Sequence, residues 1–285
     1  MARAKRIEYK GAMYHLIQRG SNREFIFKND IYKGYLIKLI KEAKGKHGFN
    51  FYGYVIMGNH YHLLIQTMDI PISKIMHEIN LNYAKYYNYK ENRTGPVFGD
   101  RYKGILVENE TYLLQLLKYL HLNPVEAGIC PSVDNYKWSS DVFYRRNMRG
   151  IVDIDPILNM ISQNRIEAIR KYMEFMDSIY SHRDFHPDVF ENLEIIGSEE
   201  FLEEMLAEYN EEIPSLDEIL RDVCPSEKEY NLIKLSCRKR NLTDYKIKYI
   251  AEARKFGYSF VEIGKYIGIS DSAAIRLLDR HIISQ

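Results

Sequence analysis

The chain has 285 residues and a formal net charge of +1, from 40 basic and 39 acidic side chains. This near-neutral total argues against a nucleic-acid partner, because such proteins usually carry excess positive charge. The charges are unevenly distributed, however: residues 1–150 carry +10, residues 151–225 carry −14 and residues 226–285 carry +5. No apolar run reaches the roughly 20 residues of a membrane span, and no signal sequence is evident, so we expect a cytoplasmic protein without membrane contact.

The charge distribution predicts three parts. Residues 1–150 are expected to form a mixed domain, residues 151–225 an acidic helical segment that packs or links without touching a polyanion, and residues 226–285 a basic helical domain. Three cysteines without a CxxC pair indicate neither a disulfide framework nor a zinc knuckle.

The first part shows strand-like and helix-like runs in the order β-α-β-β-α-β, with one further helix behind them. The expected strands are residues 12–18, 50–57, 61–67 and 101–107, and the expected helices are 30–47, 71 to the polar loop at 90, and 110–121, where Pro124 should end the last one. This order predicts an α+β fold: a ferredoxin-like split βαβ antiparallel sheet with helices on one face, followed by an all-α region. The other face of the sheet would be free for a ligand.

Residues 260–279 have the spacing of a helix-turn-helix. Gly264 permits close approach of two helices, and Gly268 supplies the turn between them. Ser270, Ser272 and Arg276 on the polar side of the second helix are the expected DNA contacts. The alternative is an ordinary helical hairpin with a glycine turn.

Two histidines, His60 and His62, are two residues apart in a predicted strand. Because side chains alternate along a strand, both imidazoles point to one face and can share a metal ion. The spacing alone is weak evidence, and two hydrogen-bonded histidines on a half-exposed strand would look the same.

The predicted helix 110–121 carries a tyrosine on the side opposite its leucines. Tyr119 should therefore face away from the core, and Asn123 would lie beside it and offer an amide oxygen suited to Mg²⁺ or Mn²⁺. A tyrosine hydroxyl, a histidine pair and an amide oxygen could together cleave a phosphodiester, with Tyr119 as the nucleophile. Without further context, Tyr119 could equally be an ordinary surface residue.

Four sequence blocks, in the same order over about 130 residues, resemble the HUH-type single-tyrosine transposases, in particular the REP-associated tyrosine transposase branch. They are Tyr14-His-Leu-Ile-Gln-Arg-Gly20, Met57-Gly-Asn-His-Tyr-His-Leu-Leu-Ile65, Gly95-Pro-Val-Phe-Gly-Asp-Arg-Tyr-Lys103 and Tyr119-Leu-His-Leu-Asn-Pro-Val-Glu-Ala-Gly128, with Trp138-Ser-Ser140 after them. The family's Met-Pro-Asn-His is Met57-Gly58-Asn59-His60 here, which alters the stiffness of the turn more than the chemistry.

This resemblance implies a ferredoxin-like domain in which His60 and His62 bind a divalent metal, Asn123 completes the metal shell and Tyr119 is the nucleophile. It also implies single-stranded DNA as substrate, often folded as a hairpin, cleaved to a 5′-phosphotyrosine and a free 3′-hydroxyl. The C-terminal part is similar to the DnaA-type helix-turn-helix extension of some members, which would bind duplex DNA. The protein could act as a monomer or a homodimer.

Several further residues follow from their position in these blocks. Asn59, Arg101, Tyr102 and Lys103 are candidate DNA contacts, although a turn-forming asparagine and a solvated strand edge are equally good explanations. We interpret His15 as a core residue. Two other functions remain open: a DNA-binding regulatory protein derived from a transposase, which no longer turns over, and a relaxase-like replication initiator.

Overall fold

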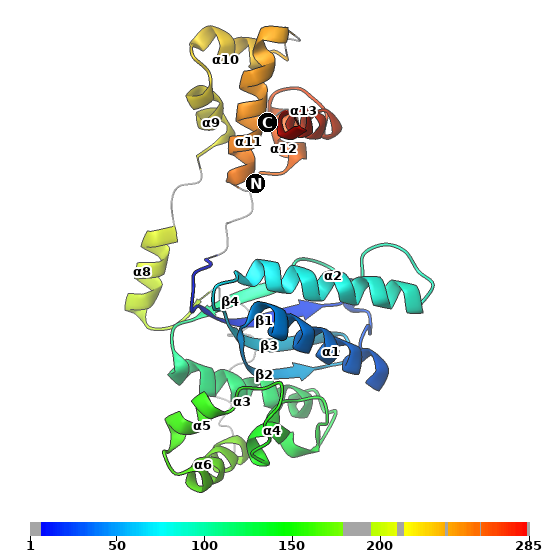
Figure 1. The fold of residues 1–285 in the computed structure, drawn as a ribbon, viewed down its shortest axis with the longest axis vertical. Coiled ribbons are helices and arrows are strands. Elements are labelled where there is room, and N and C mark those ends of the chain that lie inside the picture. The colour runs from blue at the N-terminus through cyan, green and yellow to red at the C-terminus, as the bar shows by residue number, and fades with distance from the viewer. Residues whose placement is uncertain (1–6, 179–194, 210–213, 237–238, 257, 284–285) are drawn as a thin grey trace. The chain divides into compact units, whose positions relative to one another are not determined.

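The computed structural model describes residues 7–178, 195–209, 214–236, 239–256 and 258–283 (Figure 1). The chain divides into two compact units, Glu8–Glu204 and Met205–Gln285. The three parts expected from charge do not coincide with these units, because helices of the acidic segment pack into both of them. None of the described helices is both long enough and apolar enough to span a bilayer.

The first unit is built on a five-stranded sheet with strand order β2-β3-β1-β4-β5. Its strands are β1 (Met13–Arg19), β2 (Asn50–Ile56), β3 (His60–Gln66), β4 (Lys103–Val107) and β5 (Ile195–Ile196). The first four pair antiparallel in the order that the split βαβ arrangement predicts, so that prediction is confirmed. The two-residue β5 lies parallel to β4 and makes the sheet mixed; it is too short to leave a recognisable sequence pattern.

Helices cover both faces of this sheet, which corrects the expectation that one face is free. On one face lie α1 (Asp30–His47) and α2 (Ile72–Lys90); the Tyr61 hydroxyl of β3, for example, donates to Asn80 of α2. On the other face lies α3 (Glu110–Glu126), packed so closely that a side chain at Gly53 of β2 would overlap Leu117. Because strand side chains alternate, His60 and His62 face α3 while Tyr61 faces α2.

Helix α3 runs through Pro124 to Glu126, five residues beyond its expected end at His121. Proline removes one backbone donor, but it sits in the last turn, where Ala127 N–H still donates to the Asn123 carbonyl. Asn123 is therefore helical and lies one turn after Tyr119, as the sequence predicts.

Three shorter helices follow α3 in the first unit: α4 (Asp141–Arg145), α5 (Asp155–Ile161) and α6 (Arg165–Asp177). Helix α6 packs against both α4 and α5, and the fully buried residues of this group include Tyr144, Leu158 and Tyr172. The first half of the acidic segment is thus part of the same compact unit as the sheet.

The second unit is helical, as predicted. It contains α9 (Leu216–Val223), α10 (Glu227–Lys234), α11 (Thr243–Lys255), α12 (Phe260–Tyr266) and α13 (Asp271–Ile283), and the division between the units falls within α8 (Glu199–Tyr209). Helices α12 and α13 contact each other and α11. Gly268 between them has a φ of +66°, and a side chain at Gly264 would meet the Ile269 carbonyl oxygen, so both glycines are required at this turn.

Candidate active site

The histidine pair and the predicted nucleophile meet between β3 and α3. The His60 and His62 ring centroids are 5.1 Å apart, and the Tyr119 ring stands edge-on to His62 at 5.8 Å. The structure thus brings together three residues that the sequence singled out. Tyr119 is only 4% exposed, however, so the expectation that it faces away from the buried side of α3 is wrong. Helical spacing correctly places Tyr119 opposite the leucines of α3, but this side of the helix faces the histidines of the sheet and is also buried.

His60 is oriented by the asparagine that precedes it. Its Nδ1 lies 2.6 Å from Asn59 Oδ1, and Asn59 Nδ2 donates to the Arg23 carbonyl at 3.3 Å. The carbonyl contact assigns the amide orientation, so the oxygen facing His60 can only accept and His60 Nδ1 carries the proton. The lone pair of neutral His60 is then on Nε2, the atom available to a ligand.

His62 is contacted at the same ring position by a third imidazole. His15 Nε2 lies 2.9 Å from His62 Nδ1, and both rings are fully buried. His15 also touches Tyr119, with ring centroids 5.9 Å apart. Our interpretation of His15 as a core residue captured its burial but missed its place beside the site. The signal was available in principle, because His15 and His62 fall on one face once β1 pairs with β3.

Burial keeps these imidazoles neutral. It lowers the pKa of His60 to about 4, with a smaller contribution from Arg19, and that of His15 to about 3, assisted by Lys103. Burial also holds the pKa of His62 well below its ordinary value. All three therefore keep a lone pair at neutral pH, as metal ligands require.

The donor set fits a divalent metal. His60 offers Nε2, His62 is engaged at Nδ1 and also retains Nε2, and Asn123 donates its amide nitrogen to the Tyr119 carbonyl at 2.9 Å, leaving Oδ1 as its ligating atom. Within the described residues, no three histidine, cysteine or acidic side chains are grouped to hold a metal. An ion here would rely on two imidazoles, the Asn123 amide, water and a substrate oxygen, which suits Mg²⁺ or Mn²⁺.

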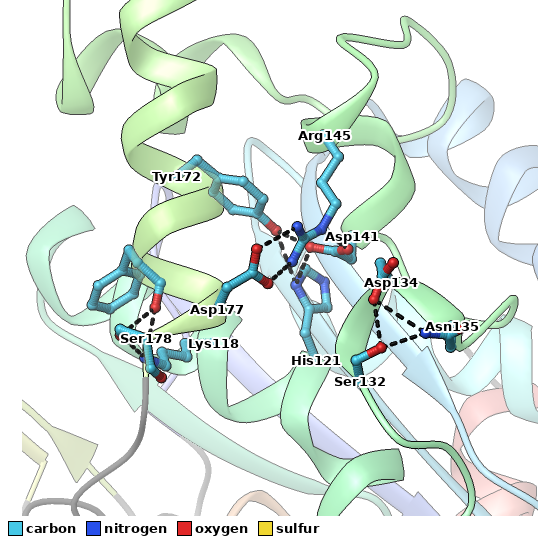
Figure 2. A network of polar contacts seen from close by, with 11 residues as sticks. Lys118, His121, Ser132, Asp134, Asn135, Asp141, Arg145, Tyr172, Asp177 and Ser178 are labelled. Atoms are coloured by element: carbon cyan, nitrogen blue, oxygen red, sulfur yellow. Dashed lines mark hydrogen bonds and ion pairs between the residues drawn. The ribbon is translucent and has the colours of Figure 1, made fainter.

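A buried polar network fixes the side of α3 that faces α4 and α6 (Figure 2). The Tyr172 hydroxyl donates to Asp141 at 2.9 Å and lies 3.1 Å from His121 Nδ1, while His121 Nε2 lies 2.7 Å from Ser140 Oγ. Since the Tyr172 proton points to the carboxylate, His121 Nδ1–H must donate to Tyr172, and the Ser140 hydroxyl donates to His121 Nε2. In this series of hydrogen bonds, from Ser140 through His121 and Tyr172 to Asp141, each contact has one donor and one acceptor.

Two cations, Arg145 and Lys118, extend this buried polar network. Arg145 donates to Asp141 at 2.5 Å and to Asp177 at the end of α6. Lys118 of α3 donates to the Phe175 carbonyl at 2.6 Å and to Ser178 Oγ at 2.7 Å (Figure 2). Lys118 and His121 flank Tyr119 in the sequence. Helix α6 therefore holds the segment of α3 that carries the predicted nucleophile.

The predicted DNA contacts of the first unit differ in solvent exposure and in their hydrogen bonds. Arg101 is exposed and Lys103 half-buried, whereas Tyr102 is only 7% exposed, which does not support a DNA contact. The Asn59 amide is turned onto His60 and the Arg23 carbonyl, an arrangement that favours a positioning role. Sequence reasoning overlooked Arg19, which pairs with His60 across the strands and is close enough to lower its pKa.

The predicted contacts of the second unit lie on the first two turns of α13 and just before it. Ser270 Oγ accepts from Ala273 N–H at 3.2 Å and so caps the helix. Ser272 and Arg276 are exposed, and Arg276 Nε donates to the Ser272 carbonyl at 3.1 Å. Ser270 thus has a structural role, and Arg276 is a cation that α13 presents to solvent.

Comparisons with known proteins bear on the first unit. Residues 8–123 match the family model described as "Transposase IS200 like". A solved REP-associated tyrosine transposase bound to a REP hairpin is similar at 22% identity, covering 54% of this chain and 90% of that chain, with a TM-score of 0.44. A putative transposase from Deinococcus radiodurans R1 is similar at 17% identity, covering 42% of this chain and 93% of that chain, with a TM-score of 0.30. A search of curated proteins finds no match. The matched residues contain the histidine pair and Tyr119, so the part of this chain that carries the site is similar to the IS200-like transposases.

Proposed function

We propose that this protein is a transposase: a metal-dependent enzyme that cleaves and rejoins single-stranded DNA through a 5′-phosphotyrosine on Tyr119. The observation that carries the proposal is the edge-on contact between Tyr119 and His62 of the same chain, at 5.8 Å. This contact favours use of Tyr119 at its own chain's site. The proposed substrates are repeats that fold as hairpins; the similar solved transposase is bound to a REP hairpin.

The reaction exchanges one phosphodiester for another. Tyr119 Oη forms a bond to phosphorus while the bond from phosphorus to the 3′-oxygen breaks, and the tyrosine proton balances the proton that the 3′-hydroxyl gains. Attack by that 3′-hydroxyl, or by the 3′-hydroxyl of another strand, reverses the step and restores the tyrosine. No external energy source is needed, because the covalent intermediate conserves the phosphoryl bond.

The residues around Tyr119 have separate tasks. His60, His62 and Asn123 would hold Mg²⁺ or Mn²⁺, which when bound supplies positive charge to the scissile phosphate. Arg19 and Lys103, both half-buried and close to the histidines, attract the phosphate backbone. Asn59 and the network behind α3 fix the orientation of His60 and of the helix that carries Tyr119.

The test is covalent capture on labelled hairpin oligonucleotides taken from the DNA that flanks the gene. Wild-type protein with Mn²⁺ should give an adduct that survives denaturing electrophoresis, and Tyr119→Phe should abolish the adduct without loss of binding. Tyr112→Phe is the matched control, since Tyr112 is a half-buried tyrosine of the same helix, and it should retain the adduct. An adduct that persists in Tyr119→Phe would exclude Tyr119 as the nucleophile.

We also propose that α12 and α13 form a helix-turn-helix that binds duplex DNA near the cleaved strand. Gly264 and Gly268 bring the two helices together, and α13 presents Arg276 and Ser272 to solvent. A duplex anchor would hold the enzyme beside its substrate.

One observation favours a second candidate, a transposase-derived DNA-binding regulator. Tyr119 is 4% exposed, so a phosphate reaches its hydroxyl only if α3 or the DNA strand adjusts. A regulator would bind the same oligonucleotides with and without Mn²⁺ and give no covalent product. The capture assay therefore separates the two functions.

A further inference from the structure

Three imidazoles meet at the site, but only two of them belong to the proposed metal pair. On β1 and β3, His15 lies opposite Leu64 and His62 lies opposite Ile17, so His15 and His62 are diagonal neighbours on the face toward α3. Their rings are nearly parallel, with centroids 5.2 Å apart and an interplanar angle of 18°. The 2.9 Å contact joins His15 Nε2 to His62 Nδ1, and neither ring is exposed.

This contact determines which nitrogen of His62 can bind a metal. Only one proton fits between the two nitrogens. If it belongs to His62 Nδ1, the lone pair of the neutral His62 ring is on Nε2 and can ligate. If it belongs to His15 Nε2, the proton of His62 is on Nε2 and that atom cannot ligate.

His15 can adopt the state that permits ligation without breaking another hydrogen bond. Its Nδ1 is buried and has no hydrogen-bond partner among the described residues, so the proton of the neutral ring can sit there. The arrangement matches that of His60, whose Nδ1 donates to Asn59 Oδ1. Each histidine of the pair would then be held at Nδ1 by an acceptor and present Nε2.

We infer that His15 is a positioning residue for the metal site: it accepts the hydrogen bond of His62 Nδ1–H and thereby fixes the tautomer and ring orientation in which His62 Nε2 can ligate. The inference rests on the proposed function, because it presupposes a metal held by His60 and His62. Partners of this kind typically change metal affinity 10- to 100-fold. His15 needs no contact with DNA in this role.

The experiment measures Mn²⁺ binding to the full chain without DNA, by titration calorimetry. His15→Phe fills the space but offers no acceptor, whereas the amide oxygen of His15→Gln can take the place of Nε2. We expect about 10- to 100-fold weaker binding in His15→Phe and substantial recovery in His15→Gln. His47→Phe is the matched control, since the side chain of His47 is also buried but lies on α1, on the opposite face of the sheet, and its Mn²⁺ affinity should equal that of wild type.

A second readout follows the proton directly. Nitrogen-15 spectra of the histidine rings in Mg²⁺-saturated protein should show His62 protonated at Nδ1 in wild type and in His15→Gln. Unchanged Mn²⁺ affinity in folded His15→Phe, or a His62 ring protonated at Nε2 in saturated wild type, would overturn the role of His15 alone. Failure of wild-type protein to bind Mn²⁺ would instead overturn the proposed metal dependence and this inference with it.

Discussion

The network behind α3 can be tested by removing a single oxygen atom. Tyr172→Phe deletes the hydroxyl that donates to Asp141 and accepts from His121, while the ring stays in place against Tyr144, 4.9 Å away between centroids. The change therefore removes hydrogen bonds and leaves the packing almost intact.

The expected loss of stability follows from the polar groups that Tyr172→Phe leaves without a partner. His121 Nδ1–H loses its acceptor and Asp141 Oδ1 loses a donor, and His121, Asp141 and Tyr172 are all at most 1% exposed, so water does not replace the hydroxyl. A buried polar group without a partner costs about 1–3 kcal/mol. Two such groups predict that the free energy of unfolding falls by about 2–6 kcal/mol. The charged Asp141 keeps Arg145, which limits the loss on its side.

Urea unfolding followed by tryptophan fluorescence reports on the right unit. The single tryptophan, Trp138, belongs to Glu8–Glu204, where its Nε1–H donates to Asp30 at 2.7 Å. Tyr89→Phe is the control, because Tyr89 is 79% exposed and its loss should cost less than about 0.5 kcal/mol. A loss below about 0.5 kcal/mol in Tyr172→Phe would refute the view that this network is fully connected and dry.

Two further predictions follow from the same contacts and from α13. Burial holds the pKa of His121 at about 4, below its ordinary value of 6.5, so the unfolded chain takes up a proton that the folded chain refuses between these pH values. The free energy of unfolding should therefore fall as pH drops from 6.5 toward 4, by up to about 1.4 kcal/mol per pH unit for this residue, and His121→Phe should show a shallower slope in urea midpoints of the Trp138 signal; equal slopes would contradict the assignment. Arg276→Ala should weaken binding to duplex DNA and lower the slope of log affinity against log salt by about 1, while leaving the hairpin adduct unchanged; an unaltered salt slope would show that α13 does not contact phosphate.

The sequence predicted most of the sheet because each long strand carries its own pattern. The runs around β2 and β3 are apolar and bounded by turn residues, and their order alone selects the split βαβ topology. The short β5 could not be predicted, since a two-residue pairing is decided by the neighbouring β4 edge and not by local preference. The continuation of α3 through Pro124 was missed for a similar reason, because a proline in a last turn removes only one hydrogen bond.

The site was predicted as a set of residues but not as an arrangement. His60, His62 and Tyr119 could be named because their types and spacing suit one chemistry. The burial of Tyr119 could not, because helical periodicity distinguishes the faces of α3 without saying which of them meets the histidines. His15 was interpreted as a core residue, and its contact with His62 was missed because that contact depends on the register of β1 against β3, which no short-range pattern determines.

The acidic middle segment illustrates what a charge count leaves out. Its −14 suggested a spacer that avoids DNA, yet several of its carboxylates are paired: Asp177 with Arg145, Asp155 with Arg165 and Glu174 with Arg170. Only the pair of Asp177 reaches α4, and together with the Lys118 contacts it joins α6 to the helix of the proposed nucleophile. Exposed pairs of this kind contribute little stability, so the segment is held mainly by its buried residues. Residues 155–177 are therefore better regarded as the support of α3 than as a separate acidic part, and removing them should damage the site before it alters the electrostatics.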